Sequence, residues 1–317
     1  MTRLDETQII ARFQKIFGSK DFSSEDVEFF KISKTNIVAK VDTLVQSTDI
    51  PPKMSLKQAA RKSVVACVSD FAAKGVRPEF AMVSVNLPTD SSEKISEIAR
   101  GFKNASKEFR FQFLGGDTNA GKEFVFSVCM FGTAKRIPKR SGAKKGDLIF
   151  VTGPFGYNSA GLKILLEKIK AQKSFYKKAT RLVLMPQPRL SFGEKCKNYF
   201  SSSMDSSDGL STTLVEMARQ SNCKFVVTNI PYKNDLATFC KNSNLNLENF
   251  VFNGGEEYEI VFTAQKKNKS MIIKNAKITK TPIIEIGYVS EGNGVYVQKN
   301  NKHTQIRDLG WHHFKFL

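Results

Sequence analysis

The stretch SLKQAARKSVVACVSDFAAKG, residues 55–75, decides the fold of this chain. Ser55 is a favoured helix N-cap residue, and Gly75 can end the helix in a left-handed turn. Val, Ala, Cys and Phe side chains dominate the residues between them, which predicts a long helix in the protein interior. Asp70 lies inside this apolar run, so its carboxylate is expected to be at least partly buried.

Strand and helix patterns alternate on both sides of this helix. Apolar residues at every second position indicate strands, and an amphipathic polar stretch indicates a further helix. The order predicts an α/β (α+β) layer with the helices on one face of a sheet. The expected elements of the first half are a helix at 5–17, strands at 35–42, 79–88, 111–118 and 123–132, and a helix at 91–109.

The length of 317 residues suits two domains better than one core. The basic segment KRIPKRSGAKKGD, residues 135–147, reads as a solvated loop, and we place a boundary in it. The expected domains are residues 1–139 and 140–317. In the second one, a strand at 148–153 enters a Gly-rich turn and a helix, and MDSSDGL, residues 204–210, precedes another helix.

The formal net charge is +19, which suits anionic partners, including phosphorylated metabolites and nucleic acid. Because the lysines are spread along the chain, we interpret the charge as composition and solubility rather than as a nucleic-acid footprint. No apolar run approaches the roughly 20 residues that span a bilayer. The N-terminus lacks the features of a secretory signal, and five scattered cysteines fit a reducing compartment. We therefore expect a cytoplasmic protein that does not bind membranes.

Several aspartates lie where they need an explanation. Buried Asp70 requires a cation, which is either a Lys or Arg partner or a metal ion. Asp42 follows an apolar strand and is either a turn residue or a ligand at the strand end. Asp205 and Asp208 form a compact oxygen-rich site of the kind that Mg²⁺ prefers, although Asp208 alone could be a helix N-cap.

Two Gly-Gly segments offer further sites. In LGGDTNAG, Gly116 lets the backbone approach a ligand next to Asp117 and Thr118, although a tight turn explains the same residues. NGGEEYEIVFT, residues 253–263, is either a hairpin turn or part of a site. Walker A, protein-kinase, GxSxG and HExxH motifs are absent from the sequence. Phosphoryl transfer would therefore need acidic residues that hold metal.

Together, these segments resemble the thiamine-monophosphate kinases, a family in the superfamily of aminoimidazole ribonucleotide synthetase. The resemblance covers nearly the whole chain in order. It rests on VDTLVQSTDIP, SVVACVSDFAAKGVRPEF, LGGDT, GDLIFVTGPFGYNSAGL, MPQPR, MDSSDGL, GGEEYEIVF and the terminal GWHHF. Three departures from the family pattern are present. In SSEDVEFF, Glu25 and Asp26 stand in for a glycine and two aspartates; VQSTDIP replaces an ending that more often contains His and Phe; and Asn119 lies where the family often has Arg.

The resemblance implies ATP-dependent, Mg²⁺-assisted phosphorylation of thiamine monophosphate in a cleft between two domains. It also implies a homodimer formed through the N-terminal domain. No general base is expected, and Asp208 is the candidate for a direct role in the transfer. The implied Mg²⁺ ligands are Asp26, Asp42, Asp70 and Asp205; the implied nucleotide contacts are Thr43, Gly116, Asp117, Thr118, Ser207 and Asp208; the implied substrate contacts are Asp49, Glu257 and Trp311.

Other interpretations stay open at this point. The chain could be another ATP-using member of the superfamily, such as an aminoimidazole ribonucleotide synthetase-like enzyme or a hydrogenase-maturation protein. It could also be a basic nucleic-acid-binding protein on a degenerate kinase fold. Trp311, the sole tryptophan, is either a stacking partner for thiamine or part of a hydrophobic plug.

Overall fold

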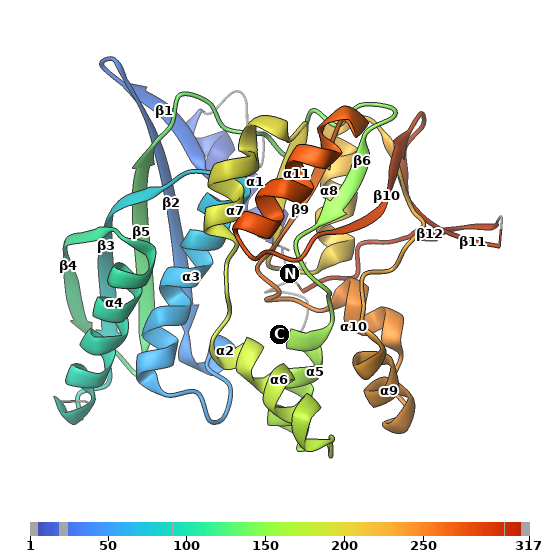
Figure 1. The fold of residues 1–317 in the computed structure, drawn as a ribbon. Coiled ribbons are helices and arrows are strands. Elements are labelled where there is room, and N and C mark those ends of the chain that lie inside the picture. The colour runs from blue at the N-terminus through green and yellow to red at the C-terminus, as the bar shows by residue number, and fades with distance from the viewer. Residues whose placement is uncertain (1–5, 19–24, 91, 301, 312–317) are drawn as a thin grey trace.

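Two β-sheets and the helices around them make up the computed structural model, which describes residues 6–18, 25–90, 92–300 and 302–311 (Figure 1). The first sheet has five strands in the order β1-β2-β5-β3-β4. Its strands are β1 (Glu28–Ile32), β2 (Thr35–Val45), β3 (Pro78–Leu87), β4 (Gln112–Ala120) and β5 (Val125–Thr133). The helical elements of this half are α1 (Glu6–Phe17), α2 (Gln46–Asp49), α3 (Leu56–Lys74), η1 (Ser92–Lys94) and α4 (Ile95–Phe109).

Helices α3 and α4 cover one face of the first sheet. Along β5, alternate residues Phe126, Val128 and Met130 are buried in one core with residues of both helices. The residues between them face the other side, because successive strand residues point to opposite faces. We call that side, turned away from α3 and α4, the open face. The expected α+β layer with helices on one face is confirmed.

The second sheet has seven strands in the order β12-β11-β8-β10-β6-β9-β7. Apolar cores lie on both of its faces, one with α5, α8, α9 and α10 and the other with α7 and α11 (Figure 1). The strands are β6 (Leu148–Val151), β7 (Ser202–Ser206), β8 (Lys224–Val227), β9 (Glu259–Ala264), β10 (Ile284–Ser290), β11 (Gly294–Lys299) and β12 (Lys302–Ile306). The helical elements are α5 (Tyr157–Glu167), α6 (Lys173–Leu184), α7 (Leu190–Cys196), η2 (Lys197–Tyr199), α8 (Leu210–Ser221), α9 (Asn234–Asn242), α10 (Leu247–Asn253), η3 (Lys266–Asn268) and α11 (Lys269–Ile278).

Helix α3 is capped as its sequence predicts, and it also connects the two halves. Ser55 caps it through a capping box with Gln58, and Gly75 ends it with a left-handed φ of 60°. Its last turn contributes Ala72 to the core that α7 and α11 form against the second sheet. A Cβ at Gly193 of α7 would lie 1.8 Å from the Ala72 carbonyl oxygen, so only glycine permits this contact between α3 and α7.

Three local expectations are wrong. Strand β2 continues to Val45, so Asp42 lies within the strand and not at its end. The stretch EEYEIVFTA predicts a strand from Glu256, but strand β9 begins only at Glu259, after the irregular GGEE segment. The basic segment 135–147 is not simply a solvated loop, because Ile137 is buried and Arg140 forms an ion pair with buried Asp26.

The two sheets lie on opposite sides of residue 140 in the sequence, and the division into domains 1–139 and 140–317 stays a prediction. None of the described helices has both the length and the hydropathy that a membrane crossing requires.

Candidate active site

Three of the four aspartates that the resemblance implies as metal ligands converge between the two sheets. Asp26 precedes β1, Asp70 lies on α3, and Asp205 lies on β7. One carboxylate oxygen of each lies within 4.8 Å of those of the other two. Their relative exposures are only 1%, 4% and 4%. We call Asp26, Asp70 and Asp205 the acidic centre.

Burial makes negative charge costly in the acidic centre. Burial, followed by the negative charge of Asp205, raises the pKa of Asp70 well above its ordinary value. Burial and the charge of Asp26 raise the pKa of Asp205 to about 7. Burial opposes ionisation of Asp26 as well, but Arg140 and Lys74 outweigh it and hold the pKa of Asp26 below its ordinary value. The centre therefore needs further positive charge before all three carboxylates can ionise together.

Two cations, Lys74, which is buried, and Arg140, whose side chain is 13% exposed, already neutralise one side of the centre. Lys74 Nζ lies 3.2 Å from Asp26 Oδ2 and donates to Glu25 Oε2 over 2.7 Å and to the Ser203 carbonyl over 2.9 Å. Arg140 Nε donates to Asp26 Oδ1 over 2.6 Å. These contacts connect the segment before β1, the end of α3, β7 and the segment between the two sheets.

The other side of the centre is formed by β2. Lys40 Nζ lies 3.1 Å from Asp70 Oδ2 and 3.8 Å from Asp42 Oδ2. Asp42 is half-buried and is not one of the three converging carboxylates, but Lys40 connects it to Asp70. Of the two explanations for Asp70, a cationic partner or a metal, the structure contains the first, which is Lys40.

The donors of the acidic centre fit a magnesium ion. Hard Mg²⁺ prefers carboxylate oxygens and is held by one or two of them together with substrate phosphates. Buried Asp26 Oδ2 receives no hydrogen bond from the described residues, although the Lys74 ammonium lies beside it. An unsatisfied buried carboxylate oxygen that faces other carboxylates is the atom that a divalent ion would complete.

Thr43 and Asp117 lie on the open face of the first sheet and not at the acidic centre. Thr43 Oγ1 lies 3.0 Å from Ser127 Oγ on β5. Ser127 is opposite Ser84 on β3, which is opposite Asp117 on β4. Three strand spacings, about 14 Å, separate β2 from β4, so Asp42 and Asp117 of one chain cannot hold the same ion.

Gly116, Asp117 and Thr118 belong to the edge strand β4 and do not form a tight turn. A Cβ at Gly116 would lie 1.8 Å from the Val83 carbonyl oxygen, so this glycine is needed where β4 pairs with β3. Asn119 Nδ2 donates to Asp117 Oδ2 over 2.7 Å. Asn119, one of the departures from the family pattern, therefore orients the Asp117 carboxylate.

The SSDG segment after β7 lies beside the GGEE segment and the C-terminal tail. The Ser207 carbonyl accepts the Glu256 N–H over 2.5 Å, and the Asp208 carbonyl accepts the Trp311 N–H over 2.9 Å. Gly209, and not Asp208, is the N-cap of α8, so a capping role does not explain Asp208. Trp311 therefore lies next to residues expected to contact nucleotide and substrate, whereas residues 312–314 of the GWHHF motif lie outside the described residues.

The GGEE segment has a strained backbone, since Glu256 and Tyr258 have φ of 63° and 53°, where L-residues are uncommon. Such strain often accompanies functional sites. Glu257 between them is buried and accepts the Gly156 N–H over 2.6 Å. Burial raises the pKa of Glu257 to about 8. The segment is not a hairpin turn, because it joins helix α10 to strand β9 and not two strands.

Asp49 ends the short helix α2, and its carboxylate accepts the Val45 N–H over 2.6 Å. Its carbonyl accepts a hydrogen bond of 2.8 Å from Lys62 Nζ. Lys62, which is only 2% exposed, also forms an ion pair with Glu256. This lysine thus connects two of the segments expected to contact substrate.

The sequence interpretation missed Lys40, Lys62 and Lys74, all of which contact acidic residues of the site. For Lys62 and Lys74, the signal in the sequence was their position in the largely apolar 55–75 helix, where a lysine requires a partner. For Lys40 the signal was the alternation along β2, which places Lys40 and Asp42 on the same face.

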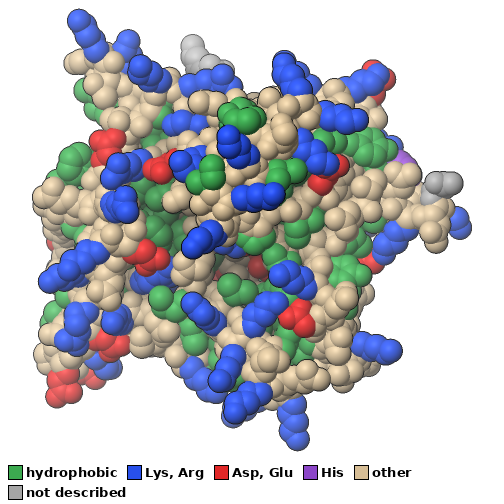
Figure 2. All heavy atoms as spheres, viewed as in Figure 1, with side chains coloured by type: hydrophobic (Ala, Val, Ile, Leu, Met, Phe, Trp, Pro, Cys, Tyr) green, Lys and Arg blue, Asp and Glu red, His purple; other side chains and the backbone are tan. Residues whose placement is uncertain are grey.

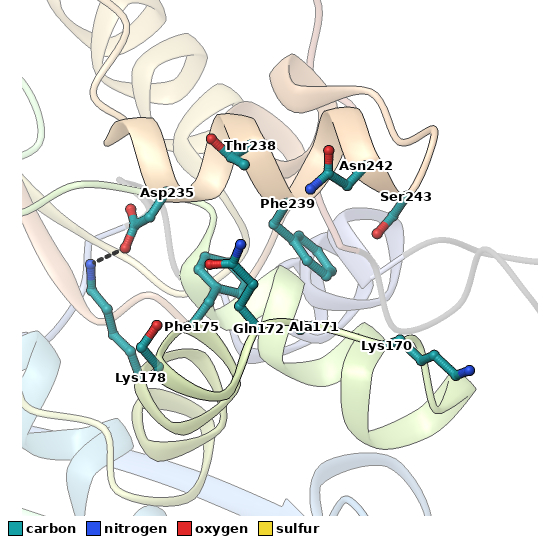
Figure 3. A pocket seen from close by; sticks show the side chains of 11 residues that line it. Lys170, Ala171, Gln172, Phe175, Lys178, Asp235, Thr238, Phe239, Asn242 and Ser243 are labelled. Atoms are coloured by element: carbon teal, nitrogen blue, oxygen red, sulfur yellow. Dashed lines mark hydrogen bonds and ion pairs between the residues drawn. The ribbon is translucent and has the colours of Figure 1, made fainter.

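A separate pocket lies between α6 and α9, with a volume of about 590 Å³ (Figure 3). Phe175 and Phe239, whose rings stack at 4.7 Å, form its apolar part. Its one lining carboxylate, Asp235, is 2.8 Å from Lys178 Nζ. None of the residues expected from the sequence lines this pocket, and it lacks the grouped carboxylates that hold a metal.

Comparison with known proteins agrees with this geometry. Residues 24–134 match the family model described as AIR synthase related protein, N-terminal domain. The chain is 59% identical to the thiamine-monophosphate kinase of Nitrosopumilus maritimus, over 99% of this chain and 100% of that protein. It is 33% identical to the thiamine-monophosphate kinase of Pyrococcus horikoshii, over 99% and 98% of the two chains.

Among solved structures, AaThiL complexed with AMPPCP and TMP superposes with a TM-score of 0.88 and 27% identity, and 99% of each chain is covered. The expected superfamily fold is thus confirmed. The full-length identity to curated relatives assigns the family as well: the chain belongs to the thiamine-monophosphate kinases of the aminoimidazole ribonucleotide synthetase superfamily.

Proposed function

We propose that this protein transfers the γ-phosphate of ATP to thiamine monophosphate and so forms thiamine diphosphate, the last step in making that cofactor. The observation that carries the proposal is the acidic centre, three buried carboxylates within 4.8 Å of one another in a chain of this family. A related structure holds AMPPCP, an ATP analogue, together with TMP. The alternative of another superfamily enzyme is not favoured, because the full-length relatives are kinases.

Donor and acceptor are both phosphates, so their mutual repulsion is the main obstacle to the reaction. Asp26, Asp70 and Asp205 would hold Mg²⁺, with Asp42 at the edge of the site. Bound Mg²⁺ would supply the positive charge that offsets this repulsion and aligns an in-line transfer. The acceptor oxygen of a phosphate monoester is already largely ionised at neutral pH, so we assign no general base.

The remaining expected residues receive proposed roles from their positions. Ser207 and Asp208, in the segment directly after Asp205, would contact the ATP phosphates, and Asp208 is the candidate for a direct role in transfer. Asp49, Glu257 and Trp311 would contact thiamine monophosphate.

An assay of ADP release tests the proposed function. With ATP and Mg²⁺, the protein should form ADP and thiamine diphosphate in equal amounts from thiamine monophosphate. Free thiamine and aminoimidazole precursors serve as the comparison substrates. ADP release with free thiamine alone, or without any thiamine compound, would exclude the assignment.

We also propose a homodimer formed through the open face of the first sheet. Val41, Phe80 and Met82 lie on this face through their pairing with β5, and their exposures are 63%, 40% and 44%. A contiguous apolar area of this kind on a monomer marks an interaction site. A partner would also bring a second Asp117 to this interface, because Asp117 lies on the open face.

Light scattering should show a dimer for the natural protein at micromolar concentration. Val41→Glu should give a monomer, because it places a charge in the buried interface. The matched control is Ile278→Glu on α11, since Ile278 is 58% exposed on the other half of the protein. A monomeric natural protein, or a dimeric Val41→Glu variant, would contradict the proposed interface.

Trp311 should stack on the cationic substrate. Its side chain is 48% exposed, so a full hydrophobic plug does not enclose it. A cation over a tryptophan face gains about 0.5–2 kcal/mol. Thiamine monophosphate should therefore quench the fluorescence of this sole tryptophan saturably, and Trp311→Leu should raise KM about tenfold with little change in kcat. Absence of quenching, with a destabilised but kinetically normal Leu variant, would favour the plug.

Nucleic-acid binding, the alternative from another class, is not favoured either, because the full-length relatives are kinases. Figure 2 shows Lys and Arg side chains scattered over the visible face rather than gathered in one patch. We therefore expect weak, strongly salt-dependent DNA binding, measured by titration with salt. Tight binding at physiological salt without kinase activity would support the alternative.

All five cysteines are free thiols, in keeping with the cytoplasmic location that we propose.

A further inference from the structure

Lys40 places a fixed positive charge inside the proposed metal site. It lies two residues before Asp42 on β2, so the two side chains share the face that packs toward α3. In the described part of the chain, the recorded ion-pair partners of Lys40 Nζ are Asp70 at 3.1 Å and Asp42 at 3.8 Å. Both partners are carboxylates that we expect to hold Mg²⁺.

Lys40 differs in its surroundings from the other two cations of the site. Lys74 is fully buried and also donates to the Ser203 carbonyl, and Arg140 contacts Asp26 on the far side of the centre. The Lys40 side chain keeps 26% exposure, and its long aliphatic stem lets the ammonium move without a change in the backbone. Lys40 is therefore the cation best placed to leave its carboxylate.

We propose that Lys40 is an exchangeable counter-ion that competes with a divalent metal for Asp70 and Asp42. The inference rests on the proposed metal centre. In the metal-free protein, the ammonium offsets repulsion among the carboxylates. A metal ion that binds there must displace the ammonium and tolerate its charge nearby, so Lys40 weakens the binding of free Mg²⁺ and favours metal that arrives with nucleotide phosphates.

Titration of the whole protein with Mn²⁺, without nucleotide, tests this competition. Mn²⁺ takes the same oxygen ligands as Mg²⁺, and the unbound ion is measured by its EPR signal. Lys40→Met should lower the dissociation constant for Mn²⁺ by about tenfold or more, because it removes a positive charge a few ångströms from the ion. The metal-free variant should also melt at a lower temperature, and Mn²⁺ should raise that temperature more than in the natural protein.

Two controls separate this role from a loss of net charge or of packing. Lys145 forms an exposed ion pair with Glu291, and the two side chains are 68% and 78% exposed. Lys145→Met removes the same charge as Lys40→Met and should leave the Mn²⁺ affinity within about twofold of that of the natural protein. Lys40→Arg keeps the charge and should also stay within about twofold of the natural protein. Lys40→Gln provides a second neutral variant if Lys40→Met does not fold, and should show the same gain in affinity.

The outcomes distinguish this inference from the proposed function. Tighter Mn²⁺ binding by the neutral variants supports it, even if the natural protein binds no Mn²⁺ detectably. Equal or weaker binding by a folded neutral variant overturns the role of Lys40 and leaves the metal centre in place. If neither the natural protein nor the neutral variants bind Mn²⁺, the inference is wrong, because removal of the ammonium should have made binding detectable. Failure to phosphorylate thiamine monophosphate would overturn the proposed function only.

Discussion

Asp70→Asn should lower kcat/KM for thiamine monophosphate by about 10² or more, while the protein stays folded. Asp70 is buried on α3, and one of its carboxylate oxygens lies within 4.8 Å of those of Asp26 and Asp205. Asparagine keeps the shape but cannot supply an anionic ligand for Mg²⁺. Because burial already raises the pKa of Asp70 well above its ordinary value, the neutral amide should cost the metal-free fold little.

Steady-state kinetics measure the fall in kcat/KM, and thermal melting shows whether the variant stays folded. The matched control is Asp235→Asn, which removes a carboxylate paired with Lys178 at the pocket between α6 and α9, away from the acidic centre. The control should keep activity within about threefold, as expected for a half-exposed ion pair. Full activity of Asp70→Asn, or loss of its fold, would contradict the metal-ligand role. Asp70 would then be only the structural partner of Lys40.

The environment of Asp70 was predictable from the sequence because it depends on one element. The apolar run at 63–75, Ser55 and Gly75 determine a buried helix by local rules, and the structure has that helix with both caps. The partner of Asp70 was not predictable in the same way. Lys40 lies on strand β2 and contacts Asp70 from there. Helix propensity and periodicity carry no information about which strand packs against a helix.

Errors at element ends have physical causes too. Asp42 was expected at a strand end because a charged residue often stops an apolar run. Strand β2 instead continues to Val45, since β5 pairs with it along its length and Lys40 neutralises the carboxylate. The continuous strand also separates Asp42 from Thr43 by placing them on opposite faces. A sequence motif alone does not show that two of its adjacent residues face opposite sides of a strand.

The GGEE segment shows what a motif does and does not reveal. The two glycines suggested a tight turn, but Gly254 has an ordinary extended backbone with φ of −80°, and it is a close contact that needs a glycine there, since a Cβ would lie 1.5 Å from Ser159 Oγ on α5. The strain itself lies at Glu256 and Tyr258, which are not glycines. Tyr258 is held there because its side chain packs in the core of the first sheet, and Lys62 holds Glu256. Tertiary contacts of this kind override local preference.

Lys74→Met should destabilise the protein by about 3–5 kcal/mol, the usual cost of removing one partner from a buried ionic network. Lys74 has no exposed surface, and its ammonium contacts Glu25, Asp26 and the Ser203 carbonyl. Without it, two buried carboxylates would share only Arg140. The same lysine ends α3 and bonds to β7, so its loss should also weaken the contact between the two sheets.

Calorimetry should record this loss as a fall in Tm of roughly 10 °C, given about 2–4 °C for each kcal/mol in proteins of this size class. Lys145→Met, in an exposed pair, should change Tm by less than about 2 °C. Adding Glu25→Gln to Lys74→Met should recover part of the loss, because it removes one of the carboxylates left without its cation. A Lys74→Met variant as stable as the natural protein would mean that Arg140 alone neutralises Asp26, and that the two sheets are held together by apolar contacts between α3 and α7.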